Sequence, residues 1–281
     1  MSVRKLATSF IFFFLVIAAT AGAQTPAGLP ACESGIRWIV NAGSLQHSQA
    51  DFPLDLQKKY FDSACTFLVI GDNPSEDYRD WTAVKTRTAT SLATVETAAA
   101  DASTTAVLYD PEGWDMTPPE EQKDPAGAAC RAGSVVHGHN KILIVTPAID
   151  LIRVIDPASR ENRFEAFAGT HLAGDIAKCA DVYEIQAQGT ETDTGAYRKF
   201  VEAEARQARA ANPHVVVLAG ISTNPTGQQV SGKEVFEAVQ SVRGSVDGFW
   251  LTVPGGGKFC PSCGAPQPKV AVDMLQRLDS K

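Results

Sequence analysis

The sequence predicts a single (β/α)₈ barrel that follows a cleavable leader. Two observations predict it: short apolar runs of strand length recur along the chain, and helix-compatible stretches separate them. Strands that alternate with helices form parallel sheets through right-handed crossovers. Polar residues collect at the ends of many runs, and no glycine-rich nucleotide-binding fingerprint follows the first run. The alternative is a doubly wound open parallel sheet.

Residues 1–23 have the pattern of a secretory signal peptide. Arg4 and Lys5 precede the apolar run FIFFFLVIAA, and the small residues AGA form a cleavage site before Gln24. The apolar run is too short, and wrongly flanked, for a stable membrane anchor. We therefore predict that residues 24–281 form one exported domain, extracellular or periplasmic.

The predicted mature chain is acidic. The whole chain has a formal net charge of −7, and removal of Arg4 and Lys5 with the leader takes it to −9. An acidic chain without a basic run is a poor candidate for binding nucleic acid or an anionic membrane. We expect a small-molecule ligand, with neither nucleic acid nor membrane as a partner.

The cysteines predict disulfides. An even number in an exported chain favours disulfides over free thiols or zinc. Two cysteines each precede an apolar run, two lie in helical stretches and two share one loop. We predict three bridges between successive cysteines, drawn from Cys32, Cys65, Cys130, Cys179, Cys260 and Cys263.

Seven runs read as strands, each rich in Val, Ile, Phe or Tyr. An eighth strand is either missing or lies within 150–178 or near the C-terminus. The predicted strands are 36–41, 66–72, 106–110, 142–146, 182–188, 214–221 and 248–253.

Three stretches between the runs read clearly as helices. The first, 197–211, is rich in alanine and charge and stops at an Asn-Pro pair. The second, 231–242, opens with Ser231 as a cap and has Glu234 three residues later. The third is 268–278. Residues 77–100 and 117–136 are also largely compatible with helix.

Two acids stand where the third run ends, in the stretch LYDPEGW. In a barrel, catalytic groups come from the C-terminal ends of the strands. Strand alternation puts Ala106, Leu108, Asp110 and Glu112 on one face. Small and apolar residues thus precede the acids on that face, which suits a strand that rises through the barrel interior to its rim. We expect both acids to meet the substrate.

The fifth run carries a polar row. Glu184, Gln186 and Gln188 share a face with Val182, while tyrosine, isoleucine and alanine lie on the other face. Buried polar groups need partners, so such a row inside a barrel predicts a ligand or a water-filled pocket.

Further polar and aromatic residues follow other runs. Trp114 and Trp250 are candidate platforms for a sugar ring or another planar ligand, although Trp250 could equally fill the core. The predicted substrate contacts include Asn41, Asp72 and Asn224; Thr146, Asp150, Ser222 and Thr252 also stand at strand ends.

The strand ending in Asp-x-Glu, a later strand with Gln near Tyr, and a last strand with Trp resemble the chitinase and endo-N-acetylglucosaminidase group of barrel glycosidases. The resemblance implies that Glu112 is the general acid and that Asp110 positions the acetamido group of the substrate. The resemblance also matches Gln186 and Tyr183 to the residues on the family's later strand, and Trp250 to the tryptophan that forms the floor of its site. The longer acidic signature of that group is absent, because Ala106 and Leu108 occupy its earlier positions.

A mechanism with two carboxylates is the more general interpretation. Hydrolysis of a glycoside needs a protonated acid and a second carboxylate as base or nucleophile. Glu112 and Glu184 could flank the bond, while repulsion from Asp110 raises the pKa of Glu112. The alternative to a catalytic role is a structural one, in which Asp110 caps the following turn and Glu112 is exposed in the loop. We predict a secreted hydrolase of glycosidic bonds in a polysaccharide or glycoconjugate. Two other functions stay open: a non-catalytic barrel that binds a carbohydrate or small ligand, and a cofactor-independent lyase or isomerase that acts on a small molecule.

Two motifs that could indicate other chemistry are set aside, and we predict neither a metal nor a cofactor. His137 and His139 precede a strand, at the end of the barrel opposite the predicted site, so a three-ligand metal centre is not expected. Cys260-Pro-Ser-Cys263 has the spacing of a redox pair but follows a glycine-rich loop, which favours a structural disulfide.

Overall fold

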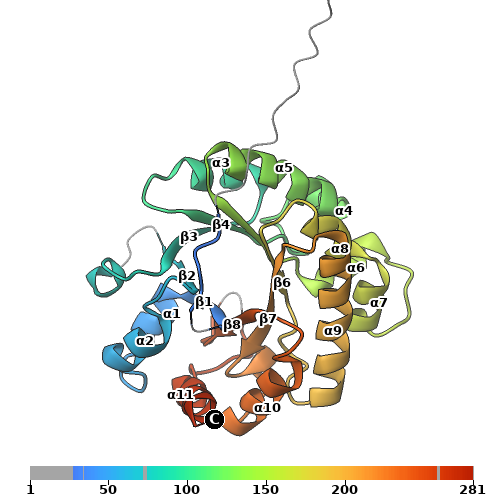
Figure 1. Cartoon of the computed structure of the whole chain (residues 1–281). Helices are drawn as coiled ribbons and strands as arrows, with labels where there is room; N and C mark the ends of the chain where they lie inside the picture. The colour runs from blue at the N-terminus through green and yellow to red at the C-terminus, as the bar shows by residue number, and fades with distance from the viewer. Residues whose placement is uncertain (1–27, 34, 72–74, 258–259, 281) are drawn as a thin grey trace, which may run out of the picture.

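A computed structural model describes residues 28–280 apart from 34, 72–74 and 258–259. Eight parallel strands close into a barrel in which each strand pairs with the next and β8 pairs with β1 (Figure 1). The predicted (β/α)₈ barrel is confirmed, and the open sheet is excluded. The strands are β1 Arg37–Asn41, β2 Thr66–Val69, β3 Val84–Ala89, β4 Ala106–Tyr109, β5 Ile142–Val145, β6 Val182–Ile185, β7 Val216–Ser222 and β8 Gly248–Thr252.

The strand missing from the sequence prediction is β3, inside a stretch expected to be helical. Its sequence VKTRTA alternates, but the outward positions carry cations. The Lys85 ammonium donates to the carbonyls of Tyr78 and Trp81 at 3.0 and 2.8 Å, and Arg87 pairs with Asp101 at 2.8 Å. These partners let charged side chains occupy a barrel wall that sequence reasoning expects to be apolar.

The region 150–178, where a strand was sought, is helical, so that expectation is wrong. It begins near η2 (Ile149–Leu151) and continues through α6 (Ile152–Ile155), α7 (Arg163–Gly169) and α8 (Leu172–Ala177). These helices cover the barrel beside β5 and β6 (Figure 1).

The three clearly predicted helices are confirmed as α9, α10 and α11. Ser231 caps α10 as expected, because Ser231 and Glu234 each accept a hydrogen bond from the other's backbone N–H. The predicted helical character of 117–136 is met by α4 and α5. The helices not yet given are α1 Ala42–His47, α2 Leu54–Phe61, η1 Glu76–Tyr78, α3 Leu92–Ala100, α4 Pro119–Lys123, α5 Pro125–Gly138, α9 Thr194–Ala211, η3 Pro225–Gly227, α10 Gly232–Val242 and α11 Pro268–Asp279.

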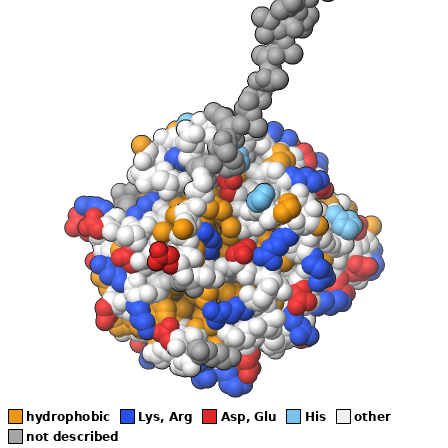
Figure 2. Space-filling model, viewed as in Figure 1, with side chains coloured by type: hydrophobic (Ala, Val, Ile, Leu, Met, Phe, Trp, Pro, Cys, Tyr) orange, Lys and Arg blue, Asp and Glu red, His pale blue; other side chains and the backbone are white. Residues whose placement is uncertain are grey.

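The core has two layers because successive strand residues point to opposite sides of the barrel wall. The larger layer lies between the barrel and the helices and includes Tyr109 and Tyr183. On the face shown in Figure 2, charged side chains of both signs are interspersed. The inner layer fills the barrel with Ile39, Phe67, Val69, Val84, Ala106, Leu108, Ile142, Ile144, Val182 and Leu218, against which Trp250 packs.

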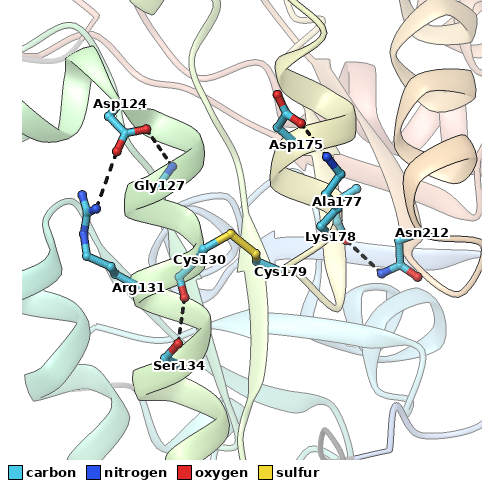
Figure 3. The surroundings of a disulfide bond; sticks show 10 residues. All are labelled: Asp124, Gly127, Cys130, Arg131, Ser134, Asp175, Ala177, Lys178, Cys179 and Asn212. Atoms are coloured by element: carbon cyan, nitrogen blue, oxygen red, sulfur yellow. Dashed lines mark hydrogen bonds and ion pairs between the residues drawn. A yellow bond between two sulfur atoms is a disulfide. The ribbon is translucent and has the colours of Figure 1, made fainter. Parts of the chain in front are cut away.

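The three predicted disulfides between successive cysteines are confirmed. Cys32 bonds Cys65, Cys130 bonds Cys179, and Cys260 bonds Cys263. The second bridge ties α5 to the segment after α8 (Figure 3). Disulfides form and persist in oxidising compartments, so the three bridges fit an extracellular or periplasmic location.

Residues 1–23, the predicted signal peptide, lie outside the described residues. Among the residues that are described, no helix has the length and apolar character needed to cross a bilayer.

Candidate active site

Asp110 and Glu112 stand directly after β4, at the C-terminal end of the barrel, which we call the mouth. Backbone pairing continues past the end of β4: the amide of Asp110 donates to Ala89 at 2.8 Å, and Pro111 accepts from Ala148 at 3.0 Å. Strand-like alternation therefore persists into this segment. Asp110 is 8% exposed and Glu112 is half-buried.

Asp110 joins the ends of three neighbouring strands. Its Oδ1 accepts from the Thr146 hydroxyl at 2.7 Å and from the Gln186 amide at 3.0 Å. The Gln186 amide also donates to the Thr146 carbonyl at 2.9 Å. Thr146 follows β5 and Gln186 follows β6, so the structure brings together two residues, Asp110 and Gln186, that the sequence predicted for one site.

The environment separates the proton affinities of the two acids. Burial, with repulsion from Asp110 and Asp150, raises the pKa of Glu112 to about 8. Burial and Asp150 also raise the pKa of Asp110, but the hydrogen bonds from Thr146 and Gln186 oppose the shift and leave it at about 6. The environment therefore favours the protonated form at Glu112 more strongly than at Asp110, because only Asp110 accepts hydrogen bonds that favour its charged form.

Asp150 is the third carboxyl of this cluster. It follows β5, and its Oδ1 accepts from the amide of Gly113 at 3.0 Å. A side chain on Gly113 would begin 3.1 Å from the Asp150 carboxylate, so glycine lets the loop after β4 approach closely. Sequence reasoning placed Asp150 near a strand end but not in the catalytic set, because the bend that brings it to Gly113 has no local signal.

Glu184 points into the barrel from β6. It is fully buried, and neither of its carboxyl oxygens has a hydrogen-bond partner within the described part of the chain. Burial, and secondarily Asp110, raise its pKa well above the ordinary value. The neighbouring Tyr183 points the other way and donates to Glu204 of α9 at 2.7 Å. The predicted alternation of β6 is thus confirmed at these two residues.

The rest of the polar row lies in the loop after β6, because the strand ends at Ile185 rather than at residue 188. Gln188 rests against Gly220 of β7: a side-chain carbon on Gly220 would lie 2.3 Å from the Gln188 amide. Glu191, which is buried, accepts from the amides of Gly189 at 2.6 Å and Ser222 at 2.8 Å. Glu191 therefore ties this loop to the end of β7.

The other predicted ligand contacts are spread around the barrel. Asn41 is exposed and caps α1, and buried Asn224 donates to the carbonyl of Cys263 at 2.6 Å. Trp250 is half-buried on the inner core, and the indole of Trp114 donates to Thr117 at 3.1 Å. Roles of these four in binding a substrate stay predictions. Asp72 lies outside the described residues.

A separate hollow of about 370 Å³ lies between α7 and α9. Its apolar lining includes Phe164 and Phe200, and it touches the loop after β6 at Gly189 and Thr190. A polar residue at its edge already has a hydrogen-bond partner within the protein, because Asn162 caps α7. We place the candidate active site at the acids instead, because there the polar groups converge and their pKa values are shifted.

In the described part of the chain, no group of three or more His, Cys, Asp or Glu side chains is arranged to hold a metal ion. His137, in the motif set aside above, bonds to Asp181 at 2.9 Å near the start of β6.

Comparisons with known proteins support the fold alone. No protein-family model matches the chain, and no curated protein matches it. Among solved structures, a "putative alpha-L-fucosidase" from Bacteroides thetaiotaomicron aligns over 99% of this chain and 100% of its own, with 7% identity and a TM-score of 0.52. The chain is thus a TIM barrel with a distant structural similarity to that protein.

Two further similarities are weaker. The N-terminal domain of a "putative aldolase" from Bacteroides vulgatus has 10% identity and a TM-score of 0.46, over 87% of this chain and 79% of that one. The carboxyl transferase domain of Rhizobium etli pyruvate carboxylase has 10% identity and a TM-score of 0.46, over 78% and 40%. Neither carries an argument about chemistry.

Proposed function

We propose that this protein hydrolyses glycosidic bonds, with Glu112 as the general acid and Asp110 as the second carboxylate. The observation that carries the proposal is the pairing of these acids at the barrel mouth with separated proton affinities: the pKa is about 8 for Glu112 and about 6 for Asp110. Glycoside hydrolysis needs one carboxyl that holds a proton and one that does not.

Glu112 supplies the proton. Its half-buried position keeps the carboxyl protonated at neutral pH while leaving part of the side chain open to a ligand. In the proposed reaction, Glu112 protonates the leaving oxygen as the bond to the anomeric carbon breaks. The departing group thus leaves as an alcohol, and Glu112 becomes a carboxylate. That carboxylate takes a proton from a water molecule as the water oxygen bonds to the anomeric carbon, which completes the hydrolysis and restores the protonated acid.

Asp110 stabilises the positive charge that develops on the sugar ring. The donors Thr146 and Gln186 both bond its Oδ1, which fixes the orientation of the carboxylate and favours its charged form. Glu184, predicted as the second catalytic carboxylate, is fully buried beside Asp110. We therefore assign the second role to Asp110 and give Glu184 a supporting role below.

The proposed substrate is a sugar ring held at the mouth. Trp250, packed on the inner core at β8, and Trp114, in the loop after Glu112, are the aromatic side chains we assign to the ring faces. Aromatic faces bury the apolar side of a pyranose, while amides bond its hydroxyl groups. Gln188 supplies such an amide, and the absence of a side chain at Gly220 gives it room.

The test compares Glu112→Gln with wild type on a panel of glycosides. A general acid matters most when the leaving group is a poor one, because a good leaving group departs without a proton. We expect turnover of natural oligosaccharides to fall by about 10²–10⁴-fold, with a much smaller loss on aryl glycosides with acidic phenols. The matched control is Glu120→Gln, an exposed glutamate at the start of α4.

Three outcomes would contradict the proposal. The first is unchanged turnover in Glu112→Gln, and the second is an equal loss for good and poor leaving groups. The third is binding by wild type without turnover of any glycoside, which would identify the alternative of a non-catalytic binding barrel.

A further inference from the structure

The carboxyls at the barrel mouth have no countercharge in the described part of the chain. Asp110, Glu112, Asp150 and Glu184 interact electrostatically in sequence, Asp150 with the first two and Asp110 with Glu184. None of them forms an ion pair with a described Lys, Arg or His, although such pairs are numerous elsewhere on the barrel. This concentration of acids is electrostatically unfavourable in the free protein.

Glu184 is a second and independent observation at this site. Its carboxyl is fully buried and points into the barrel, yet neither oxygen has a hydrogen-bond partner among the described residues. Buried polar groups are nearly always hydrogen-bonded, and an unsatisfied one costs free energy. A group that enters the mouth with several donors would satisfy it.

Asp110 and Asp150 each have a carboxyl oxygen that is not engaged within the described ranges. The hydrogen bonds to Asp110 both end on its Oδ1, and the bond to Asp150 ends on its Oδ1. The Oδ2 atoms of both residues thus have no donor among the described residues. The site offers oxygen acceptors and negative charge, and its few donors, such as Gln186, are already engaged.

We propose that the saccharide bound at this mouth carries a protonated amino group, as in a deacetylated amino sugar, and that its ammonium lies among Asp110, Asp150 and Glu184. The inference rests on the proposed function for the saccharide part of the ligand. An ammonium brings three donors and one positive charge, which are the two things the site lacks. An anionic sugar would meet only like charge, and a neutral one would leave the charge uncompensated.

Proton release is the signature that separates this ligand from a neutral sugar. A cation favours the ionised form of nearby acids, so its binding expels protons held by the cluster. The groups whose pKa is raised here are Asp110, Glu112 and Glu184. Tyr183 and Tyr197 interact electrostatically with Glu184, and Glu191 interacts with Tyr197. Affinity for the amine should therefore rise with pH until the amine itself deprotonates.

The experiment titrates the mature full-length protein with glucosamine and galactosamine, and with their N-acetylated counterparts. These monosaccharides contain no glycosidic bond, so binding is measured without turnover. We expect the free amines to bind at least about tenfold more tightly at low salt. Calorimetry in buffers of different ionisation enthalpy should show proton release for the amines and none for the acetylated sugars.

Two variants test the assignment of the ammonium site, one within the acidic cluster and one as a matched control. Asp150→Asn removes one carboxylate and should abolish most of the preference for the amine. Asp156→Asn removes the same charge from the exposed end of α6 and should leave the preference intact. Equal binding of amine and acetylated sugar, binding without proton release, or equal effects of the two variants would overturn the inference.

The results also separate this inference from the proposed function. Hydrolysis of glycosides with no preference for amines would overturn the ammonium assignment and leave the hydrolase intact. Tight, proton-releasing binding of amines without hydrolysis of any amino-sugar oligomer would support the ammonium site and overturn the hydrolase.

Discussion

Buried acids on the inner and outer faces of the barrel wall differ in their hydrogen bonding. On the outer face, Tyr183 donates to Glu204 and Tyr109 donates to Glu121, both at 2.7 Å, so each strand is fastened to a helix. On the inner face, Glu184 is the next residue after Tyr183, and neither of its oxygens has a hydrogen-bond partner among the described residues. The same strand thus carries a phenol–carboxyl hydrogen bond on one side, which engages one of the two Glu204 oxygens, and a carboxyl with neither oxygen engaged on the other.

This difference indicates which acids serve the fold and which serve a site. A phenol–carboxyl hydrogen bond satisfies the buried hydroxyl and one carboxyl oxygen, and it links a strand to a helix. An unpartnered buried carboxyl destabilises the folded state, and such local violations are expected at functional positions. We therefore assign the outer acids to stability and the inner acids to ligand chemistry.

The largest expected effect is on the pH dependence of stability. The folded pKa of Glu112, about 8, exceeds its ordinary value near 4.5, so its contribution is fully present below about pH 4.5 and is lost as pH rises through 8. We expect the free energy of unfolding of wild type to fall by roughly a few kcal/mol between about pH 5 and pH 9. Urea titrations followed by tryptophan fluorescence measure it.

Glu112→Gln should reduce that fall, because glutamine does not titrate. Asp110, Glu191 and Glu204, whose pKa values burial also raises, still contribute in the variant. Glu120→Gln, at an exposed glutamate, should follow wild type. Superimposable curves for wild type and Glu112→Gln would show that Glu112 does not hold its proton in the folded state.

The substitution Tyr183→Phe, on the outer face, should have an effect of intermediate size on the free energy of unfolding. Loss of the phenol leaves the buried Glu204 carboxyl without its donor, which should lower the free energy of unfolding by about 1–3 kcal/mol with glycoside turnover retained. The control is Tyr60→Phe, whose hydroxyl donates to the exposed Asp279 at 2.7 Å. An equal loss of stability in both variants would contradict a special stabilising role for the Tyr183–Glu204 hydrogen bond.

The smallest expected effect is that of Glu184→Gln on stability. Because burial raises the pKa of Glu184 and so favours its uncharged form, an amide of the same shape is a close substitute. We expect the free energy of unfolding to stay within about 1 kcal/mol of wild type at pH 7 and to exceed it at higher pH. A loss of several kcal/mol would mean that the carboxyl is structural and would remove the contrast between the two faces.

Most of the barrel could be predicted from the sequence because seven strands have apolar side chains on both faces. The third strand, β3, could not, because its outward Lys85 and Arg87 depend on partners from other segments. Its alternation, VKTRTA, was the available signal. The disulfides were predictable because successive cysteines flank elements that are neighbours in such a barrel.

The residues of the candidate site could be predicted where strand alternation sets the direction of a side chain. They could not be predicted where the path of a loop sets its position. Strand alternation indicated that Asp110 and Gln186 face the same space, and their hydrogen bond follows from it. The approach of Asp150 to Gly113 depends on how the loop after β5 turns. The burial of Glu184 depends on the depth of the inner core, which no local pattern encodes.

The pH–rate profile of glycoside hydrolysis tests the central claim most directly. If ionised Asp110 and protonated Glu112 act together, kcat/KM should be bell-shaped, with an acid limb near the Asp110 pKa of about 6 and a basic limb near the Glu112 pKa of about 8. In Glu112→Gln, the remaining activity should lose the basic limb. A basic limb of unchanged position in that variant would contradict the assignment of Glu112 as the proton donor.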